Sequence, residues 1–141
     1  MMNGSIAQNI ARFGEVDSEQ VIQAAKLAGV HEMVLRFPHG YDMVVGESGG
    51  ILSAGQRQRI ALARALYGMP PIVVLDEPNA NLDEAGEVAL VQAIQQLKQQ
   101  HRTVILVTHR KSIISVTDQL LTLENGKIHS IQQRPVLHKE K

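Results

Sequence analysis

The N-terminal part of the chain has the apolar spacing of short amphipathic helices. After Asp17, a residue type that caps helix N-termini, apolar residues recur at three- and four-residue spacing as far as Gly29. This pattern predicts one helix between these two residues and a second, shorter helix at residues 31–36.

A third helix is predicted after a glycine-rich stretch. Residues 46–50 include three glycines, and we expect a flexible loop there. Ser53, with Gln56 three residues later, is typical of a capping box, and an Ala-rich helix should run from there to about Leu66. Residues 1–67 are therefore expected to form a helical part.

Two short apolar runs have the character of buried strands. Residues 72–75 and 104–107 are apolar without alternation, which is typical of a parallel sheet covered on both faces. Between them lies a helical pattern with Leu90, Ile94 and Leu97 on one face. Strand, helix and strand in this order predict a βαβ unit.

The last part of the chain has the pattern of a β-hairpin followed by a tail. Residues 120–124 and 127–131 flank the dipeptide Asn125-Gly126, which suits a type I′ turn better than any other pair. The polar and basic residues 132–141 are expected to be loose.

Length and composition fit one domain or a large piece of one. The 141 residues, 44% of them hydrophobic, allow a packed core. We divide the chain into the helical part at 1–67, an α/β layer at 68–131 and the tail at 132–141. Lys plus Arg equal Asp plus Glu at 14 each, so no basic field favours nucleic acid. No apolar run approaches the roughly 20 residues of a membrane-spanning helix. Because cysteine and a signal-peptide pattern are both absent, we expect a cytoplasmic compartment.

Two interpretations of residues 53–56 stay open. Small residues at a helix start leave N–H groups unpaired at the positive end of the helix dipole, and such a site attracts phosphate. Ser and Gln at this spacing are also common in ordinary capping boxes. On this segment alone, the ordinary cap is the better interpretation.

Two adjacent carboxylates follow the first predicted strand. Asp76 and Glu77 should emerge at its C-terminal end, where open α/β sheets bind ligands. Asp76 suits a Mg²⁺ ion, and Glu77 suits a general base for an attacking water. The alternative is a helix cap or a solvated acidic turn, and Pro78 does turn the chain at once. We favour the functional interpretation because of the position at the sheet edge.

One histidine and one further aspartate accompany these carboxylates. His109 ends the second strand at the same edge, where an imidazole can donate to a phosphate and orient Glu77. Asp83 has an adequate explanation as the N-cap of the helix that follows. The remaining histidines are interpreted as surface or packing residues: His31, His39, His101, His129 and His138.

The order of these elements resembles the nucleotide-binding domain of ABC transporters. Residues 52–56 match the family signature LSGGQ except at Ala54, and residues 72–77 resemble the Walker B strand with its catalytic glutamate. Residues 81–83 resemble the D-loop, and His109 resembles the switch histidine. Several motifs in one order are far more specific than any one of them.

This resemblance implies a fold, cofactors and roles. The fold would be α/β, a partial P-loop NTPase with a helical signature subdomain, the Walker B half of the parallel sheet and a C-terminal β-hairpin. The cofactors would be ATP and Mg²⁺. The implied catalytic residues are Glu77 and His109, the metal ligand is Asp76, and the nucleotide-binding residues are Ser53, Ala54, Gly55, Gln56 and Asp83. Since Ala54 adds only a small Cβ to the usual signature glycine, we expect a modest effect there.

Finer features are most similar to the exporters of bacterial type I secretion systems, which pass proteases or other polypeptides. They lie in residues 4–10, 37–42, 46–50 and 76–83. The implied partners are a second nucleotide-binding domain in a head-to-tail dimer, the transmembrane domain of an exporter, a membrane fusion protein and an outer-membrane channel. The implied location is the cytoplasmic face of the inner membrane.

The chain has no Walker A pattern, the loop whose N–H groups and lysine cradle the phosphates of ATP. Its only Gly-Lys pair is Gly126-Lys127, which lies in the predicted hairpin turn and is followed by Ile128. We therefore expect that the chain alone neither binds ATP tightly nor hydrolyses it.

Three hypotheses follow. In the first, the chain is the C-terminal piece of an ATPase domain that hydrolyses MgATP to drive polypeptide export. In the second, it is a non-catalytic partner that pairs with an intact domain and regulates it. In the third, it belongs to a soluble ABC ATPase that acts on DNA, and the neutral charge and short helical part argue against this.

Overall fold

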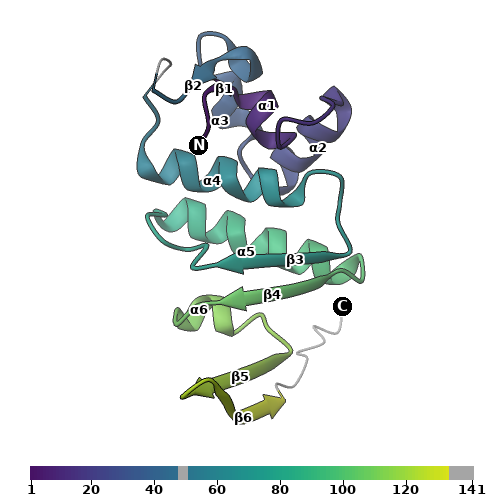
Figure 1. Ribbon diagram of the computed structural model, residues 1–141, viewed down its shortest axis with the longest axis vertical. Coiled ribbons are helices and arrows are strands. Elements are labelled where there is room, and N and C mark those ends of the chain that lie inside the picture. The colour runs from purple at the N-terminus through teal and green to yellow at the C-terminus, as the bar shows by residue number, and fades with distance from the viewer. Residues whose placement is uncertain (48–50, 134–141) are drawn as a thin grey trace. The chain divides into compact units, whose positions relative to one another are not determined.

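The computed structural model describes residues 1–47 and 51–133 (Figure 1). The chain divides into two compact units, Met1–Thr108 and His109–Lys141, and each is described by itself. Within the described ranges, no helix is long and apolar enough to cross a membrane.

The N-terminal part of the first unit is helical. Its elements are β1 Gly4–Ser5, α1 Ile6–Ile10, α2 Ser18–Leu27, α3 His31–Leu35, the 3₁₀ helix η1 Gly40–Asp42 and β2 Val44–Val45, with β1 antiparallel to β2. The Asp17 carboxylate accepts the N–H groups of Glu19 and Gln20 at the start of α2. Gly29, in the left-handed region at φ 73°, follows its end. Both helices predicted here are confirmed, although α3 ends one residue earlier than expected.

Helix α4, Ala54–Leu66, connects the helical part to the sheet. Helices α1 and α2 pack against it, and it also contacts β3, Ile72–Asp76, the first strand of the parallel sheet (Figure 1). The residues that it buries are Ile60, Leu62, Ala63 and Leu66. Because α4 serves both layers, the boundary at residue 67 stays a prediction.

The βαβ unit predicted from the sequence is confirmed. Strands β3, Ile72–Asp76, and β4, Thr103–Val107, are parallel, and helix α5, Glu84–Gln99, connects them. Three residues that define the predicted apolar face of α5 are almost wholly buried: Leu90, Ile94 and Leu97. In Figure 1 the arrowheads of β3 and β4 lie on the side where α4 begins.

The expectation that both faces of this sheet are covered is wrong for the described chain. Val73 and Leu75 are buried on one face. On the other face the exposed fractions are 58% for Ile72, 61% for Val74, 50% for Ile105 and 53% for Val107. The parallel register pairs Val74 with Ile105, so these side chains form one apolar surface. A continuous apolar run predicts two covered faces whether or not the covering segments belong to the chain.

The second unit contains α6, Lys111–Ile114, and a hairpin of β5, Gln119–Glu124, and β6, Lys127–Gln133. The hairpin prediction is confirmed, and Asn125 and Gly126 both have positive φ, as a type I′ turn requires. Strand β6 includes residues 132 and 133, so the tail begins later than expected. Residues 134–141 of the predicted tail and 48–50 of the predicted loop lie outside the described residues.

We expect the isolated chain to aggregate, because the apolar surface of the β3–β4 sheet is open to water. Replacing Val74 and Ile105 together with threonine keeps good strand formers and should increase the monomeric fraction several-fold, measured by size-exclusion chromatography with light scattering. Val88→Thr, at an exposed valine of α5, is the matched control. A wild-type chain that stays monomeric and melts cooperatively would contradict this account.

Candidate functional site

The predicted carboxylates lie at the C-terminal ends of the two parallel strands. Asp76 is the last residue of β3 and pairs with Val107, the last residue of β4. Asp76 is exposed and Glu77 is half-buried. The βαβ topology thus places both acids at the edge of the sheet where α/β folds bind ligands, as their sequence position indicates.

The backbone of Glu77 is in an unusual conformation. Its φ is 46°, in the left-handed region that residues other than glycine rarely adopt. Such a residue costs about 1–3 kcal/mol and persists only where its surroundings impose it. Here the Glu77 N–H donates to the Val107 carbonyl at 2.8 Å, and the Glu77 carbonyl accepts the Ala80 N–H at 3.0 Å.

The start of α4 is a capping box. Ser53 Oγ accepts the Gln56 N–H at 3.1 Å, and Gln56 Oε1 accepts the Ser53 N–H at 2.9 Å. The ordinary-cap interpretation is thus present in the structure, and both polar side chains are engaged in it. Within residues 1–47 and 51–133, the N–H groups of Ala54 and Gly55 have no hydrogen-bond partner. These two N–H groups are what the helix start can offer to an anion.

Gly55 lies against the loop that begins with Glu77 and ends with Asp83. We call this loop, residues 77–83, the acid loop. A Cβ on Gly55 would lie 2.8 Å from the carbonyl oxygen of Asn81, closer than real Cβ atoms come to backbone. Asn81 has φ 60°, a left-handed conformation that asparagine tolerates. Gly55 is therefore required by the acid loop of its own domain, a reason that the motif alone does not reveal.

Asp83 caps α5 and binds α4. Its Oδ1 accepts the Gly86 N–H at 2.8 Å and the Arg59 Nη2 donor at 2.6 Å. The Gly86 N–H, and after it the Arg59 guanidinium, lower the pKa of Asp83. A Cβ on Gly86 would lie 3.0 Å from Arg59 Nε and from Asp83 Oδ1, so this turn of α5 packs closely under the ion pair.

Further polar contacts that sequence reasoning missed hold the acid loop. Gln58 Nε2 of α4 lies 3.2 Å from the Pro78 carbonyl oxygen and 3.5 Å from that of Glu77. On the other side, Thr108 Oγ1, just after β4, donates to Asn79 Oδ1 at 2.9 Å, and Asn79 is buried. The acid loop is thus fixed between α4 and the end of β4.

His109 is the first residue of the second unit and is exposed. Glu77 belongs to the first unit, and nothing is inferred about the position of His109 relative to it. Its role as the switch histidine stays a prediction.

Asp76 could hold a Mg²⁺ ion only if other ligands came from outside the protein. In the part of the chain that the structure describes, no cluster of three or more His, Asp or Glu side chains could hold a metal ion. Mg²⁺ in phosphate-transfer sites needs only one or two carboxylates, because phosphate oxygens and water supply its other ligands. Asp76 meets that requirement. The site does not fit an ion held by the protein alone.

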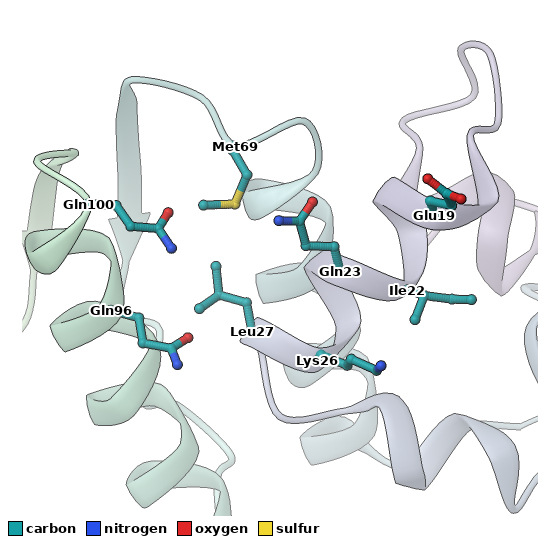
Figure 2. Close-up of a pocket in the computed structure, with 8 residues that line it drawn as sticks. All are labelled: Glu19, Ile22, Gln23, Lys26, Leu27, Met69, Gln96 and Gln100. Atoms are coloured by element: carbon teal, nitrogen blue, oxygen red, sulfur yellow. The ribbon is translucent and has the colours of Figure 1, made fainter.

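A hollow of about 500 Å³ lies elsewhere in the first unit (Figure 2). It is lined by Glu19, Ile22, Gln23, Lys26 and Leu27 of α2, by Met69, and by Gln96 and Gln100 at the end of α5. Figure 2 shows Leu27 and Met69 among three glutamine side chains. None of the predicted site residues lines this hollow, so it is not the candidate site.

Comparison with known proteins agrees with this geometry. The family described as "ABC transporter" matches residues 3–80, and the chain belongs to this family. It is 52% identical over 128 residues to the type I secretion system ATP-binding protein PrsD of Rhizobium meliloti (strain 1021), covering 90% of this chain and 22% of PrsD. It is 44% identical over 129 residues to the leukotoxin translocation ATP-binding protein LktB of Mannheimia haemolytica, covering 91% and 18%.

A lipid exporter and a solved structure are also similar. An ATP-dependent lipid A-core flippase of Saccharophagus degradans is 43% identical over 129 residues, covering 91% of this chain and 22% of the flippase. A structure of a bacterial Atm1-family ABC exporter with ATP bound superposes with a TM-score of 0.83 at 36% identity, covering 94% of this chain and 23% of the exporter. The predicted ABC ATPase fold is confirmed. The chain spans about a fifth of the length of these relatives.

Asp83→Asn should remove part of the chain's sensitivity to acid. Because the folded-state pKa of Asp83 is lowered, the unfolded chain binds more protons, and stability is lost as pH falls through the ordinary pKa of an aspartate towards the lower folded pKa. Melting temperatures between pH 7 and pH 3, measured in the Val74→Thr/Ile105→Thr background that we expect to be monomeric, should fall less with Asp83→Asn than without it. Glu84→Gln, in the same helical turn, is the matched control. Equal slopes for the two variants would contradict the role of the Gly86 and Arg59 contacts.

Proposed function

We propose that this chain is the C-terminal part of the ATPase domain of an ABC exporter, and that the full-length protein, here called the parent, hydrolyses MgATP to drive export of a polypeptide. The observation that carries the proposal is the packing of the capped helix α4 against the acid loop in a member of the ABC family. The names of PrsD and LktB support polypeptide export over other cargo.

Each acid has a proposed role at the ends of the strands. Asp76 holds Mg²⁺, which neutralises charge on the phosphates. Glu77 accepts a proton from the water that attacks the terminal phosphate. His109 donates a hydrogen bond to that phosphate and orients Glu77.

The start of α4 has a proposed role at a second nucleotide. The N–H groups of Ala54 and Gly55 face the phosphate of ATP held by the Walker A loop of a partner domain, paired head to tail. Ser53 and Gln56 shape this surface through the capping box. Asp83 contributes indirectly, because its contacts with Arg59 and Gly86 fix the position of the acid loop.

The proposed assembly follows from what the chain does and does not contain. It carries a signature and acids but no Walker A pattern, so the chain alone is proposed to be inactive. In the parent, we propose that it works with a transmembrane domain at the cytoplasmic face of a bacterial inner membrane. A membrane fusion protein and an outer-membrane channel complete the export path.

In the parent, Glu77→Gln should slow ATP turnover about 10²- to 10⁴-fold, because an amide of the same shape cannot accept the proton. ATP and Mg²⁺ should stay bound, and the closed dimer should accumulate, as measured by steady-state turnover beside nucleotide-dependent dimerisation. Glu84→Gln, at an exposed glutamate of α5, should leave turnover unchanged. Near-normal turnover in Glu77→Gln would exclude Glu77 as the base.

Gly55→Asp in the parent domain should abolish ATP-driven pairing while the domain still binds ATP at its own Walker A. Two unit charges 4 Å apart repel by about 4 kcal/mol at an effective dielectric constant of 20. Since any Cβ here meets the Asn81 carbonyl, Gly55→Ala separates the steric effect from the charge. We expect Gly55→Ala to weaken pairing and Gly55→Asp to remove it, measured as ATP-dependent dimerisation beside nucleotide binding. If Gly55→Asp paired and hydrolysed ATP normally, residues 53–56 would be only a helix cap.

A further inference from the structure

The residue after Glu77 leaves the strained acid loop short of hydrogen-bond donors. Pro78 has no N–H, and it is buried, so its carbonyl oxygen needs a donor from elsewhere in the fold. The Glu77 N–H is already bound to the Val107 carbonyl. Besides the Ala80 N–H within the loop, the left-handed backbone at Glu77 is therefore held by contacts that reach the loop from outside it.

Gln58 supplies the missing donor. Its side-chain nitrogen lies 3.2 Å from the Pro78 carbonyl oxygen, and 3.5 Å from that of Glu77, which is at the limit of a hydrogen bond. Carbonyl oxygens only accept, so the NH₂ end of the amide must face them. One side chain thus contacts the two peptide groups that flank Pro78.

The position of Gln58 is itself fixed. Gly55, Gln58 and Arg59 are spaced three and four residues apart, so they lie on one face of α4. Gly55 lies against the Asn81 carbonyl, and Arg59 binds Asp83 at 2.6 Å. These two contacts set the distance between α4 and the acid loop, and Gln58 acts between them.

We propose that Gln58 is a positioning residue for Glu77: by binding the carbonyl oxygens of Glu77 and Pro78, it holds the base in its left-handed conformation. This inference rests on the proposed function of Glu77 as the base. The contacts of Gln58 are to the carbonyl oxygens of Glu77 and Pro78 and not to the Asp76 carboxylate, so its loss should affect the chemical step and leave nucleotide binding unchanged.

The test compares Gln58→Met, which keeps the length but removes the donor, with Gln95→Met at an exposed glutamine of α5. In the parent, Gln58→Met should lower kcat about 10- to 100-fold, the scale expected for a misplaced catalytic group, with the KM for ATP unchanged. In the Glu77→Gln background, Gln58→Met should have no further effect, because the group it positions is gone. Gln95→Met should match wild type throughout.

A second readout does not depend on turnover. The Ala80 N–H donates to the Glu77 carbonyl, so release of Glu77 should open this turn and speed hydrogen exchange at Ala80 in Gln58→Met but not in Gln95→Met. Unchanged exchange and unchanged kcat would overturn the proposal, and so would an equal loss of turnover with and without Glu77. If the wild-type parent hydrolyses no ATP, the proposed function fails, while faster exchange at Ala80 still supports the positioning role.

Discussion

The first two turns of α4 lie against the acid loop at a separation that the backbone sets. Gly55 approaches the Asn81 carbonyl so closely that no side chain fits between them, and one turn later Arg59 binds Asp83. This packing holds the start of α4, with the N–H groups of Ala54 and Gly55, against the loop that begins at Glu77. In the proposed dimer these N–H groups and Glu77 serve two different nucleotides, so one contact within the domain links the two sites.

Two residues of the acid loop have left-handed backbones, and contacts on both sides of the loop hold them in place. Glu77 and Asn81 both have left-handed backbones, which a free loop would not keep. The end of β4 holds one side through the Val107 carbonyl and the Thr108–Asn79 hydrogen bond, and α4 holds the other. The buried Asn79 amide oxygen is satisfied by this arrangement, so the polar group strengthens the loop instead of destabilising it.

Local signals in the sequence predicted the elements well. Asp17 and Ser53 cap their helices, and Asn125-Gly126 forms the turn, because each of these effects acts within a few residues. The sequence also predicted Asp76 and Glu77 at the sheet edge, because residues at the C-terminal end of a parallel strand lie at that edge.

Effects that act over longer separations were not predicted. Gln58 and Arg59 contact residues 19 to 24 positions away, and two of their three partner groups are backbone carbonyls, which leave no trace in the residue types. The left-handed conformation of Glu77 is likewise not encoded by glutamate itself. The second face of the sheet was expected to be covered because an apolar run records what a strand prefers, not which segments are present to cover it.

Hydrogen exchange at the start of α4 tests the central claim most directly. The N–H groups of Ala54 and Gly55 have no partner among the described residues, so they should exchange fast in the ATP-free parent domain. In the Glu77→Gln variant with saturating MgATP, the account predicts that a peptide spanning residues 52–56 becomes protected, and that Gly55→Asp abolishes this protection without loss of ATP binding. If ATP binds but exchange in this peptide stays unchanged, the start of α4 does not face a nucleotide, and the account is contradicted.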